Sequence, residues 1–188
     1  MKNLKLLISV VLWLGVIGMG YWLYRVIQEP IEFKAEYEKR RTATINRLID
    51  IREAQGFYLD VNGNYANQWD DLINSIKLDS LMVIKTFGDP DDTTIVTTFD
   101  TSFIMLRDTI NFVGTRNLDS LKVIPFSGGQ LFELESDILT QQRVKIPVYQ
   151  VQAFKSQYLK GLNKDLVTTK RDLVLGSLSR PSESGSWE

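Results

Sequence analysis

The chain begins with an apolar segment that differs from everything after it. No charged side chain occurs from Leu6 to Tyr24, a run of 19 residues. A helix rises ~1.5 Å per residue, so this run would span about 28 Å, close to the hydrocarbon thickness of a bilayer. The pattern predicts a transmembrane helix over residues 6–25, preceded by a short basic N-terminus over residues 1–5.

The predicted membrane helix has candidate anchors at its far end and small residues in its middle. Aromatic and basic side chains favour the headgroup layer, which predicts interfacial anchors at Tyr21, Trp22, Tyr24 and Arg25. Small residues allow close approach of a second membrane helix, which makes helix packing at Gly15, Gly18 and Gly20 a candidate role. A cleavable signal peptide is the alternative, although the apolar run is longer than the usual core of such a peptide.

A second pattern, with helical spacing, follows the apolar run. Residues 26–58 have one proline, Pro30, where a kink is expected, and their first half, 32–41, is mostly charged. The spacing predicts a long stem helix whose charged half is solvated. Its second half is expected to pack on a sheet through apolar residues at Ile45, Leu48, Ile49, Ile51, Phe57 and Tyr58.

Beyond the stem the period changes from helix to strand. An Asn62-Gly63 turn and a short helix over 69–76, capped near Asn67, precede β-branched or alternating runs at 81–84, 93–98, 103–106, 121–124, 131–134 and 145–149. A hairpin is expected around Ser127–Gly129, a helical turn within 158–166 and a last strand at 173–178. We therefore expect an α+β fold with an antiparallel β-rich soluble domain over 59–178 and a loose, Ser-rich tail over 179–188. Its core aromatic residues are expected to be Trp69, Phe87, Phe99, Phe103, Phe112, Phe126 and Phe132.

Composition removes several classes of function. The chain has 22 basic and 23 acidic side chains, and its 188 residues include no His and no Cys. Catalytic triads, thiol chemistry and metal sites built on imidazole or thiolate are therefore excluded. The near-neutral charge argues against nucleic acid as a partner, since such domains are normally basic.

Acidic side chains offer two candidate calcium loops and one carboxylate pair. Asp60, Asn62 and Asn64 match the first positions of an EF-hand frame, but the glycine required at its sixth position is Tyr65. Asp89, Asp91 and Asp92 form a second oxygen cluster around Pro90. For both loops a polar turn is the favoured interpretation. Glu133 and Glu135 alternate with apolar residues, which places them on the exposed face of a strand rather than in an acid–base pair. We expect no enzyme activity, cofactor or metal.

The order of elements resembles the type IV pilin and type II secretion pseudopilin architecture. The segment 54–65, in which a helix closes with Phe57 and Tyr58 before an Asn-Gly-x-Tyr turn, resembles the end of a pseudopilin stem. The chain is also similar to uncharacterised single-pass envelope proteins of Bacteroidota, including Ile124-Pro125-Phe126-Ser127 and the terminal Ser186-Trp187-Glu188. No acidic residue interrupts the apolar run and no prepilin processing site precedes it. The resemblance therefore does not imply cleavage by a prepilin peptidase or polymerisation into a long filament.

The resemblance implies a function and a topology. It predicts a non-enzymatic, membrane-anchored structural subunit of a bacterial envelope assembly, which contacts other subunits or itself through the N-terminal helix. The N-terminus would be cytoplasmic and the domain periplasmic, on the inner membrane. The count of basic residues at the two ends of the apolar run favours the opposite orientation. The alternative function is a stand-alone bitopic protein whose periplasmic domain binds a glycan or a protein.

Overall fold

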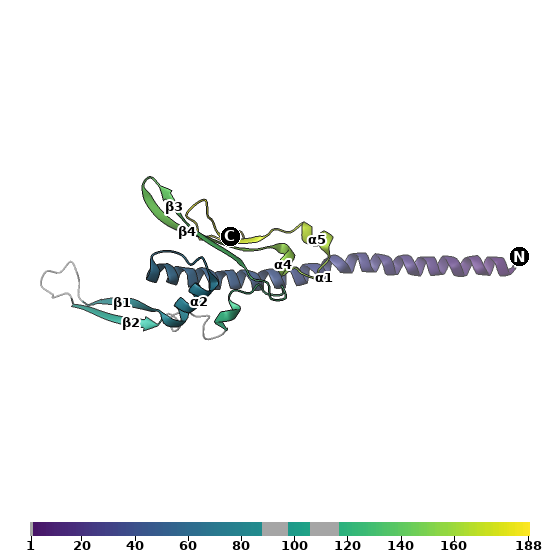
Figure 1. Cartoon of the computed structure of the whole chain (residues 1–188). Coiled ribbons are helices and arrows are strands. Elements are labelled where there is room, and N and C mark those ends of the chain that lie inside the picture. Colours follow the sequence, from purple (N-terminus) through teal and green to yellow (C-terminus); the bar gives the residue numbers. More distant parts are fainter. Residues whose placement is uncertain (1, 88–97, 106–116) are drawn as a thin grey trace.

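A single long helix organises the molecule. The computed structural model describes residues 2–87, 98–105 and 117–188. Helix α1, Lys2–Asn62, runs for 61 residues and extends as a bare rod beyond the domain at the N-terminus (Figure 1). It continues through Pro30, so the predicted membrane and stem helices are one element. At ~1.5 Å per residue, α1 is about 90 Å long.

The C-terminal end of α1 lies four residues beyond the predicted end at residue 58. Asp60, Val61 and Asn62 are helical, and Gly63 follows with φ of 71° while its N–H donates to the Leu59 carbonyl at 2.7 Å. Glycine is favoured here because it enters the left-handed region without a Cβ clash. The Asn-Gly pair therefore ends the helix. The sequence pattern had instead predicted that the helix ends at residue 58 and that this pair belongs to a separate turn.

Helix α2, Trp69–Leu78, confirms the short helix expected after this turn. Asp70 and Asp71 lie in its first turn, where the helix dipole favours negative charge, and Leu72, Ile73 and Ile76 form its buried side. The residue at its N-cap is Gln68, whose side chain makes no capping hydrogen bond, so the predicted cap near Asn67 is not formed by Asn67 itself.

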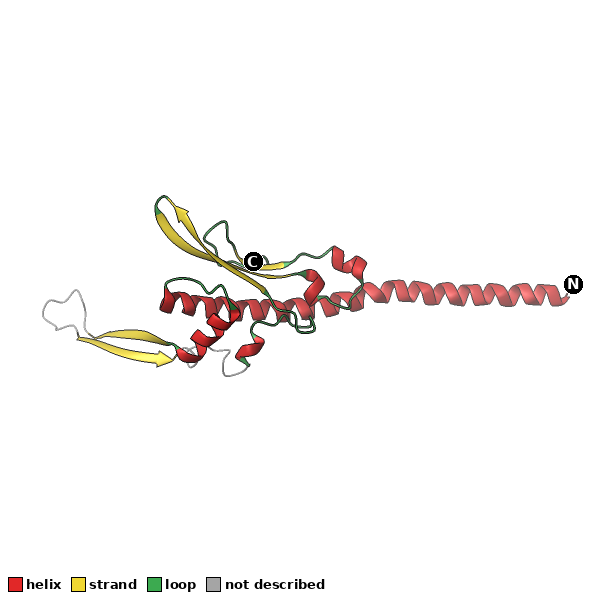
Figure 2. Cartoon of the chain, in the orientation of Figure 1, coloured by secondary structure: helices red, strands yellow, loops and turns green. Residues whose placement is uncertain are grey.

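A three-stranded antiparallel sheet lies along the second half of α1 (Figure 2). Its strands are β3, Glu133–Gln141, β4, Val144–Ala153, and β5, Leu173–Gly176, in the order β3-β4-β5. The α+β class is thus confirmed. The β3–β4 turn, Gln142-Arg143, has φ of 47° and 72°, and positive φ at both residues is what a type I′ hairpin turn requires. Neither residue type signals such a turn in a sequence.

Strands β1, Ser80–Phe87, and β2, Thr98–Met105, pair antiparallel in a separate hairpin that projects from the far end of the domain (Figure 1). Most of the strand predicted at 93–98 lies outside the described residues. The run predicted as a strand at 121–124 follows the 3-10 helix η1, Leu118–Ser120, and makes one isolated bridge, Val123 with Leu131. The turn around Ser127–Gly129 therefore connects two segments that share a single bridge, and they do not form the two strands of a regular hairpin.

Two short helices connect β4 to β5. They are α4, Lys155–Tyr158, and α5, Lys164–Thr168, which together replace the single turn expected within 158–166. The last strand is also shorter than expected, because it ends at Gly176 rather than residue 178.

The C-terminal segment 179–188, expected to be a loose tail, makes ordered contacts with the domain. The Ser186 N–H donates to the Val174 carbonyl at 2.7 Å, and Gly185 forms a bridge with Leu175. The Arg52 guanidinium lies 2.7 Å from the Glu188 carboxylate, and Trp187 packs against the core. The polar, Ser-rich composition of the segment did not indicate these contacts, which combine backbone hydrogen bonds with the side chains of Trp187 and Glu188.

The core lies between α1, α2 and the sheet. Leu48 and Ile51 of α1, Val151 of β4 and Leu175 of β5 are fully buried. Among the predicted core aromatics, Phe132 is buried and Trp69 is partly buried against it. Phe103 is 70% exposed and Phe126 45% exposed, so both predictions were wrong. The side chains of Phe87, Phe99 and Phe112 lie outside the described part.

Candidate functional site

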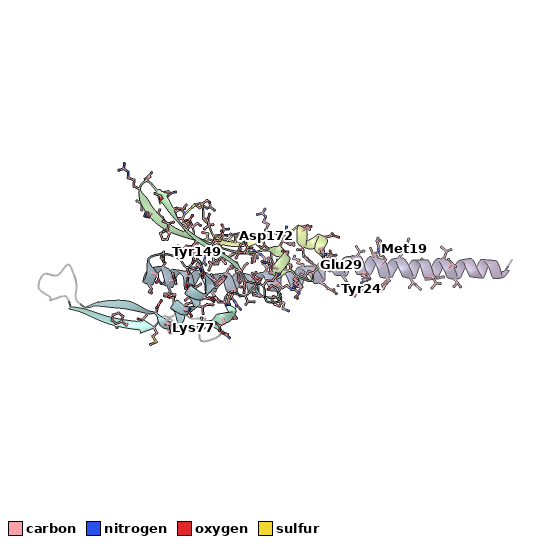
Figure 3. The ribbon with its side chains drawn as sticks, viewed as in Figure 1. Met19, Tyr24, Glu29, Lys77, Tyr149 and Asp172 are labelled. Atoms are coloured by element: carbon pink, nitrogen blue, oxygen red, sulfur yellow. The ribbon has the colours of Figure 1, made fainter. Side chains whose placement is uncertain are left out.

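The exposed apolar part of α1 is the most distinctive surface of the described residues. From Val10 to Ile27 the large apolar side chains are 48% to 75% exposed, and none of this stretch contacts the domain core. Figure 3 shows Met19 and Tyr24 on the bare part of the helix, away from Tyr149 inside the domain. The segment is long and apolar enough to cross a membrane, a test that an N-terminal signal sequence also passes.

The three predicted packing glycines do not share one face of this helix. A Cβ added at any of them would meet nothing within 4 Å, so each marks open space on the surface. With 3.6 residues per turn, Gly15 and Gly18 lie about 60° apart around the axis, whereas Gly20 lies about 160° from Gly18. Gly15 and Gly18 thus form one shallow notch, and Gly20 lies nearly opposite.

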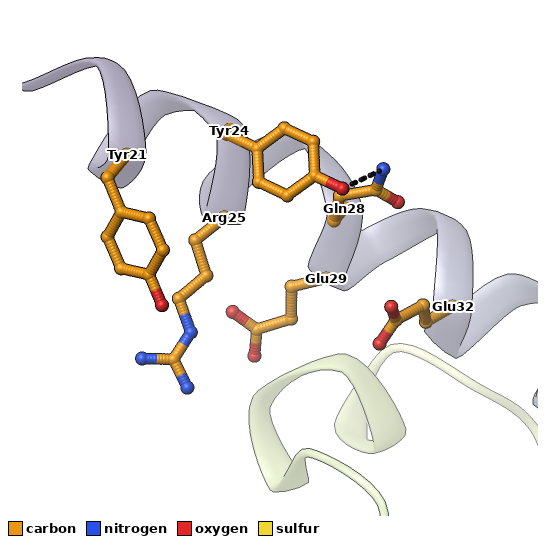
Figure 4. Close-up of a pocket in the computed structure, with 6 residues that line it drawn as sticks. All are labelled: Tyr21, Tyr24, Arg25, Gln28, Glu29 and Glu32. Carbon is orange, nitrogen blue, oxygen red and sulfur yellow. Dashed lines mark hydrogen bonds between the residues drawn. The ribbon is translucent and has the colours of Figure 1, made fainter. Parts of the chain in front are cut away.

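Three of the four predicted interfacial anchors line a shallow pocket of about 360 Å³ (Figure 4). Tyr21, Tyr24 and Arg25 line it together with Gln28, Glu29 and Glu32. The Gln28 amide donates to the Tyr24 hydroxyl at 3.1 Å. Trp22 is 68% exposed and contributes no lining to this pocket. The apolar run therefore gives way within two turns to a polar belt, where Figure 4 shows Glu29 facing the yellow-green ribbon of the α4–α5 region.

This polar belt is also where the domain begins to cover α1. The Asn163 side-chain amide donates to the Glu29 carboxylate at 2.6 Å, and the Arg40 guanidinium donates to the Lys160 carbonyl at 2.8 Å. The Lys170 ammonium lies 4.5 Å from the centre of the Tyr37 ring, within cation–π range.

The charged half of the stem is therefore not fully solvated, as its composition had suggested. Phe33 is buried and stacks with Tyr37, with ring centres 6.1 Å apart. The signal available in the sequence was the aromatic pair at positions 33 and 37, which have the spacing of one helix face.

The predicted stem-packing residues divide between core and surface. Leu48 and Ile51 are fully buried, and Ile45, Phe57 and Tyr58 pack at the margin of the core, whereas Ile49 is 39% exposed. Gln55, a fully buried polar residue on the same helix, had no signal in the apolar pattern. Its side-chain amide donates to the Ala66 carbonyl at 3.1 Å and its oxygen accepts from the Ala66 N–H at 3.0 Å. These two hydrogen bonds hold the segment that follows α1 against the helix.

A second pocket of about 340 Å³ lies between the end of α1, β4 and the C-terminal segment. The Tyr65 hydroxyl donates to the Glu183 carboxylate at 2.6 Å, and the Tyr65 and Tyr149 ring centres are 4.4 Å apart. Burial raises the pKa of both hydroxyls, and for Tyr65 the bond to Glu183 raises the pKa further. The Tyr149 hydroxyl is buried and has no hydrogen-bond partner within the described chain. Apart from Ser182, the rest of the pocket lining is apolar and consists of Leu59, Ile146, Pro147, Val148 and Pro181.

The candidate calcium ligands do not converge. Asp60 and Asn62 lie in the last turn of α1, where the Asn62 amide donates to the Tyr58 carbonyl, and Asn64 is exposed beyond the helix. Within residues 2–87, 98–105 and 117–188, no group of three acidic side chains is placed to hold a metal ion. Asp89, Asp91 and Asp92 lie outside the described residues. Glu133 and Glu135 are both exposed on β3, as expected for the solvent face of a strand.

Comparisons with protein-family models, with curated proteins and with solved structures found no match.

Proposed function

We propose that this chain is a non-enzymatic, membrane-anchored structural subunit of a bacterial envelope assembly, similar in form to a minor pseudopilin. One observation carries the proposal. The 61 residues of α1 form an uninterrupted helix whose first part is apolar and exposed and whose second part is buried under the domain. A rod of this kind links a domain rigidly to whatever covers the apolar part.

Exposure of the apolar surface of α1 to water is unfavourable, so a bilayer or a partner is expected to bury it. Each large apolar side chain that leaves water contributes roughly 1.5–3 kcal/mol, and more than a dozen such side chains are exposed between Val10 and Ile27. A bilayer covers all sides of a helix at once, and Gly15 and Gly18 leave room there for a second helix. Tyr21, Trp22, Tyr24 and Arg25 then lie in the headgroup layer on the domain side. In the pseudopilin arrangement this is the periplasmic side of the inner membrane.

The test is to purify the tagged full-length protein from native membranes in mild detergent and identify what accompanies it by mass spectrometry. We expect stoichiometric recovery of a secretion ATPase, a polytopic platform protein or pilin-like subunits. Recovery of the protein alone, as a monomer or dimer, would contradict the proposal.

Comparison of a double and a single glycine variant shows which face of α1 packs against partner helices. Gly15→Leu/Gly18→Leu fills the notch and is expected to release partners that pack through it, whereas Gly20→Leu adds the same side chain on the nearly opposite face and should retain them. Equal recovery with both variants would show that lateral packing does not use this notch.

The second candidate is a stand-alone bitopic protein with a ligand-binding domain. The pocket beside Tyr149 favours it, because a buried hydroxyl without a partner carries a free-energy cost that a hydrogen-bonding ligand could offset. Purification without subunits of an envelope assembly, together with a glycan or protein ligand whose affinity falls in Tyr149→Phe, would support this candidate.

A further inference from the structure

Residues 155–168, here called the α4–α5 turn, form a groove on the side of the domain nearest the exposed apolar part of α1. The groove has a volume of about 600 Å³ and an apolar floor that includes Leu159, Leu162 and Val167. Lys155, Lys160 and Lys164 surround this floor. An apolar floor with a basic rim suits an amphipathic anion.

The position of the turn along α1 brings it to the level of lipid headgroups. Asn163, between α4 and α5, donates to the Glu29 carboxylate at 2.6 Å. Glu29 lies five residues after Tyr24, the last residue of the uncharged run, which corresponds to about 7.5 Å along the helix axis. The polar layer on each side of a bilayer is roughly 5–7 Å thick. The contact that holds this turn to α1 is therefore at the outer edge of the headgroup layer.

The charge of this region is opposite to that of the domain that carries it. Residues 155–172 have five basic and two acidic side chains, a net charge of +3, whereas residues 30–188 have 19 basic and 22 acidic side chains, a net charge of -3. Basic side chains near an anionic bilayer surface each contribute about 1 kcal/mol of attraction.

Two of the lysines in the region are already engaged and two are available. The Lys155 ammonium donates to the Thr168 and Lys170 carbonyls at 2.9 and 3.0 Å, and the Lys170 ammonium lies over the Tyr37 ring. Lys160 and Lys164 are exposed, and within the described ranges neither ammonium pairs with a carboxylate.

We propose that the α4–α5 turn binds the headgroup of an anionic phospholipid in the membrane that α1 enters, with Lys160 and Lys164 contacting the phosphate. Leu162 and Val167 lie against the lipid backbone. The site holds the domain against the membrane surface and limits rotation of the rod. This inference rests on the membrane anchoring in the proposed function but not on the identity of the envelope assembly.

Hydrogen exchange of the full-length protein in lipid nanodiscs tests the proposal. One set of discs contains phosphatidylcholine alone, and the other contains about one third phosphatidylglycerol, which has an anionic headgroup. We expect the amides of residues 159–168 to exchange on the order of tenfold more slowly in the anionic discs. Inorganic phosphate added to the phosphatidylcholine discs should leave these rates unchanged.

The matched variants neutralise two lysines of the turn or two basic residues elsewhere. Lys160→Gln/Lys164→Gln should remove the slowing, whereas Lys145→Gln/Arg180→Gln, which neutralises exposed residues outside the groove, should retain it. Equal rates in the two kinds of disc, slowing that survives Lys160→Gln/Lys164→Gln, or slowing by free phosphate would each overturn the proposal.

The same experiment separates this proposal from the membrane anchoring on which it rests. Protected amides over residues 10–24 in both kinds of disc, without a lipid effect at 159–168, would overturn the headgroup site alone. Free exchange over residues 10–24 would overturn the anchor and the headgroup site together.

Discussion

Gln55 is a fully buried polar side chain on α1, next to the buried Ile51 and Ala54. Its amide satisfies both the N–H and the carbonyl of Ala66, and the Ser136 hydroxyl donates to the carbonyl of the adjacent Tyr65, so side chains of α1 and β3 both hold the loop after α1. Buried backbone groups that lose their partners cost about 1–3 kcal/mol each. Gln55 therefore helps to fix the path of the chain after Gly63 has ended the helix.

Gln55→Met keeps the length of the side chain but leaves both Ala66 groups without their partner. We expect the free energy of unfolding to fall by about 2–4 kcal/mol, measured by denaturant titration of the full-length protein in detergent micelles. Gln141→Met, at an exposed end of β3, should change stability by less than about 0.5 kcal/mol. A similar change in the free energy of unfolding for the two variants would show that the Gln55 hydrogen bonds do not stabilise the fold.

The ion pair between Arg52 and Glu188 makes attachment of the C-terminal segment dependent on pH. The hydrogen bond from Arg52 lowers the pKa of the Glu188 carboxyl below its ordinary value of 4.5. A carboxyl with a lowered pKa in the folded state stabilises that state above its unfolded pKa, and the contribution is lost as the pH falls through the folded value.

We therefore expect Glu188→Gln to lower the unfolding midpoint at neutral pH and to match the unsubstituted protein below the pKa of the folded carboxyl. Paired denaturation curves across this pH range measure the difference. Glu135→Gln removes one negative charge from the exposed face of β3 and controls for net charge. A difference between Glu188→Gln and the unsubstituted protein that stayed constant down to the lowest pH would refute the role of this pair.

Among the elements, α1 illustrates how one glycine sets an end and another does not. Gly63 follows the helix with φ of 71°, while Gly56 lies inside the helix without a positive φ and with nothing near its missing Cβ. The same substitution should therefore act in opposite directions at the two positions.

Gly63→Ala should destabilise the protein by about 1 kcal/mol, because alanine is strained in the left-handed region that ends the helix. Gly56→Ala should stabilise it by roughly 0.5–1 kcal/mol, because alanine loses less backbone freedom in a helix. Thermal unfolding followed by circular dichroism compares the two variants. A gain of stability for Gly63→Ala would mean that α1 ends elsewhere.

At the scale of the whole molecule, α1 gives the protein two ends with different surroundings. The apolar end has no cover within the described chain, and the domain end carries the sheet, the tyrosine pocket and the β1–β2 hairpin. If α1 spans a membrane as proposed, its orientation decides which compartment the domain can act in. The basic flank at Lys2 and Lys5 competes with basic residues after Tyr24 for the cytoplasmic side.

Orientation can be measured cleanly because the chain contains no Cys. With the domain periplasmic, Lys145→Cys at the β3–β4 hairpin should react with a membrane-impermeant maleimide after the outer membrane alone is permeabilised. Asn3→Cys should react only after the inner membrane is also opened. The reverse pattern would place the domain in the cytoplasm, as the basic-residue count favours.

Local patterns of apolar and charged residues were enough to predict the main elements of the fold. The uncharged run, the helical spacing from Ile45 to Tyr58 and the β-branched or alternating runs at 81–84, 131–134 and 145–149 predicted the long helix and the α+β class, and those predictions hold. Tertiary structure alone decided the burial of Phe33, the exposure of Phe103 and Phe126, and the docking of the C-terminal segment on β5. It also decided that Asn163 reaches Glu29, a partner 134 residues away. Periodicity reports which face of an element is apolar, whereas these outcomes depend on which distant element covers that face.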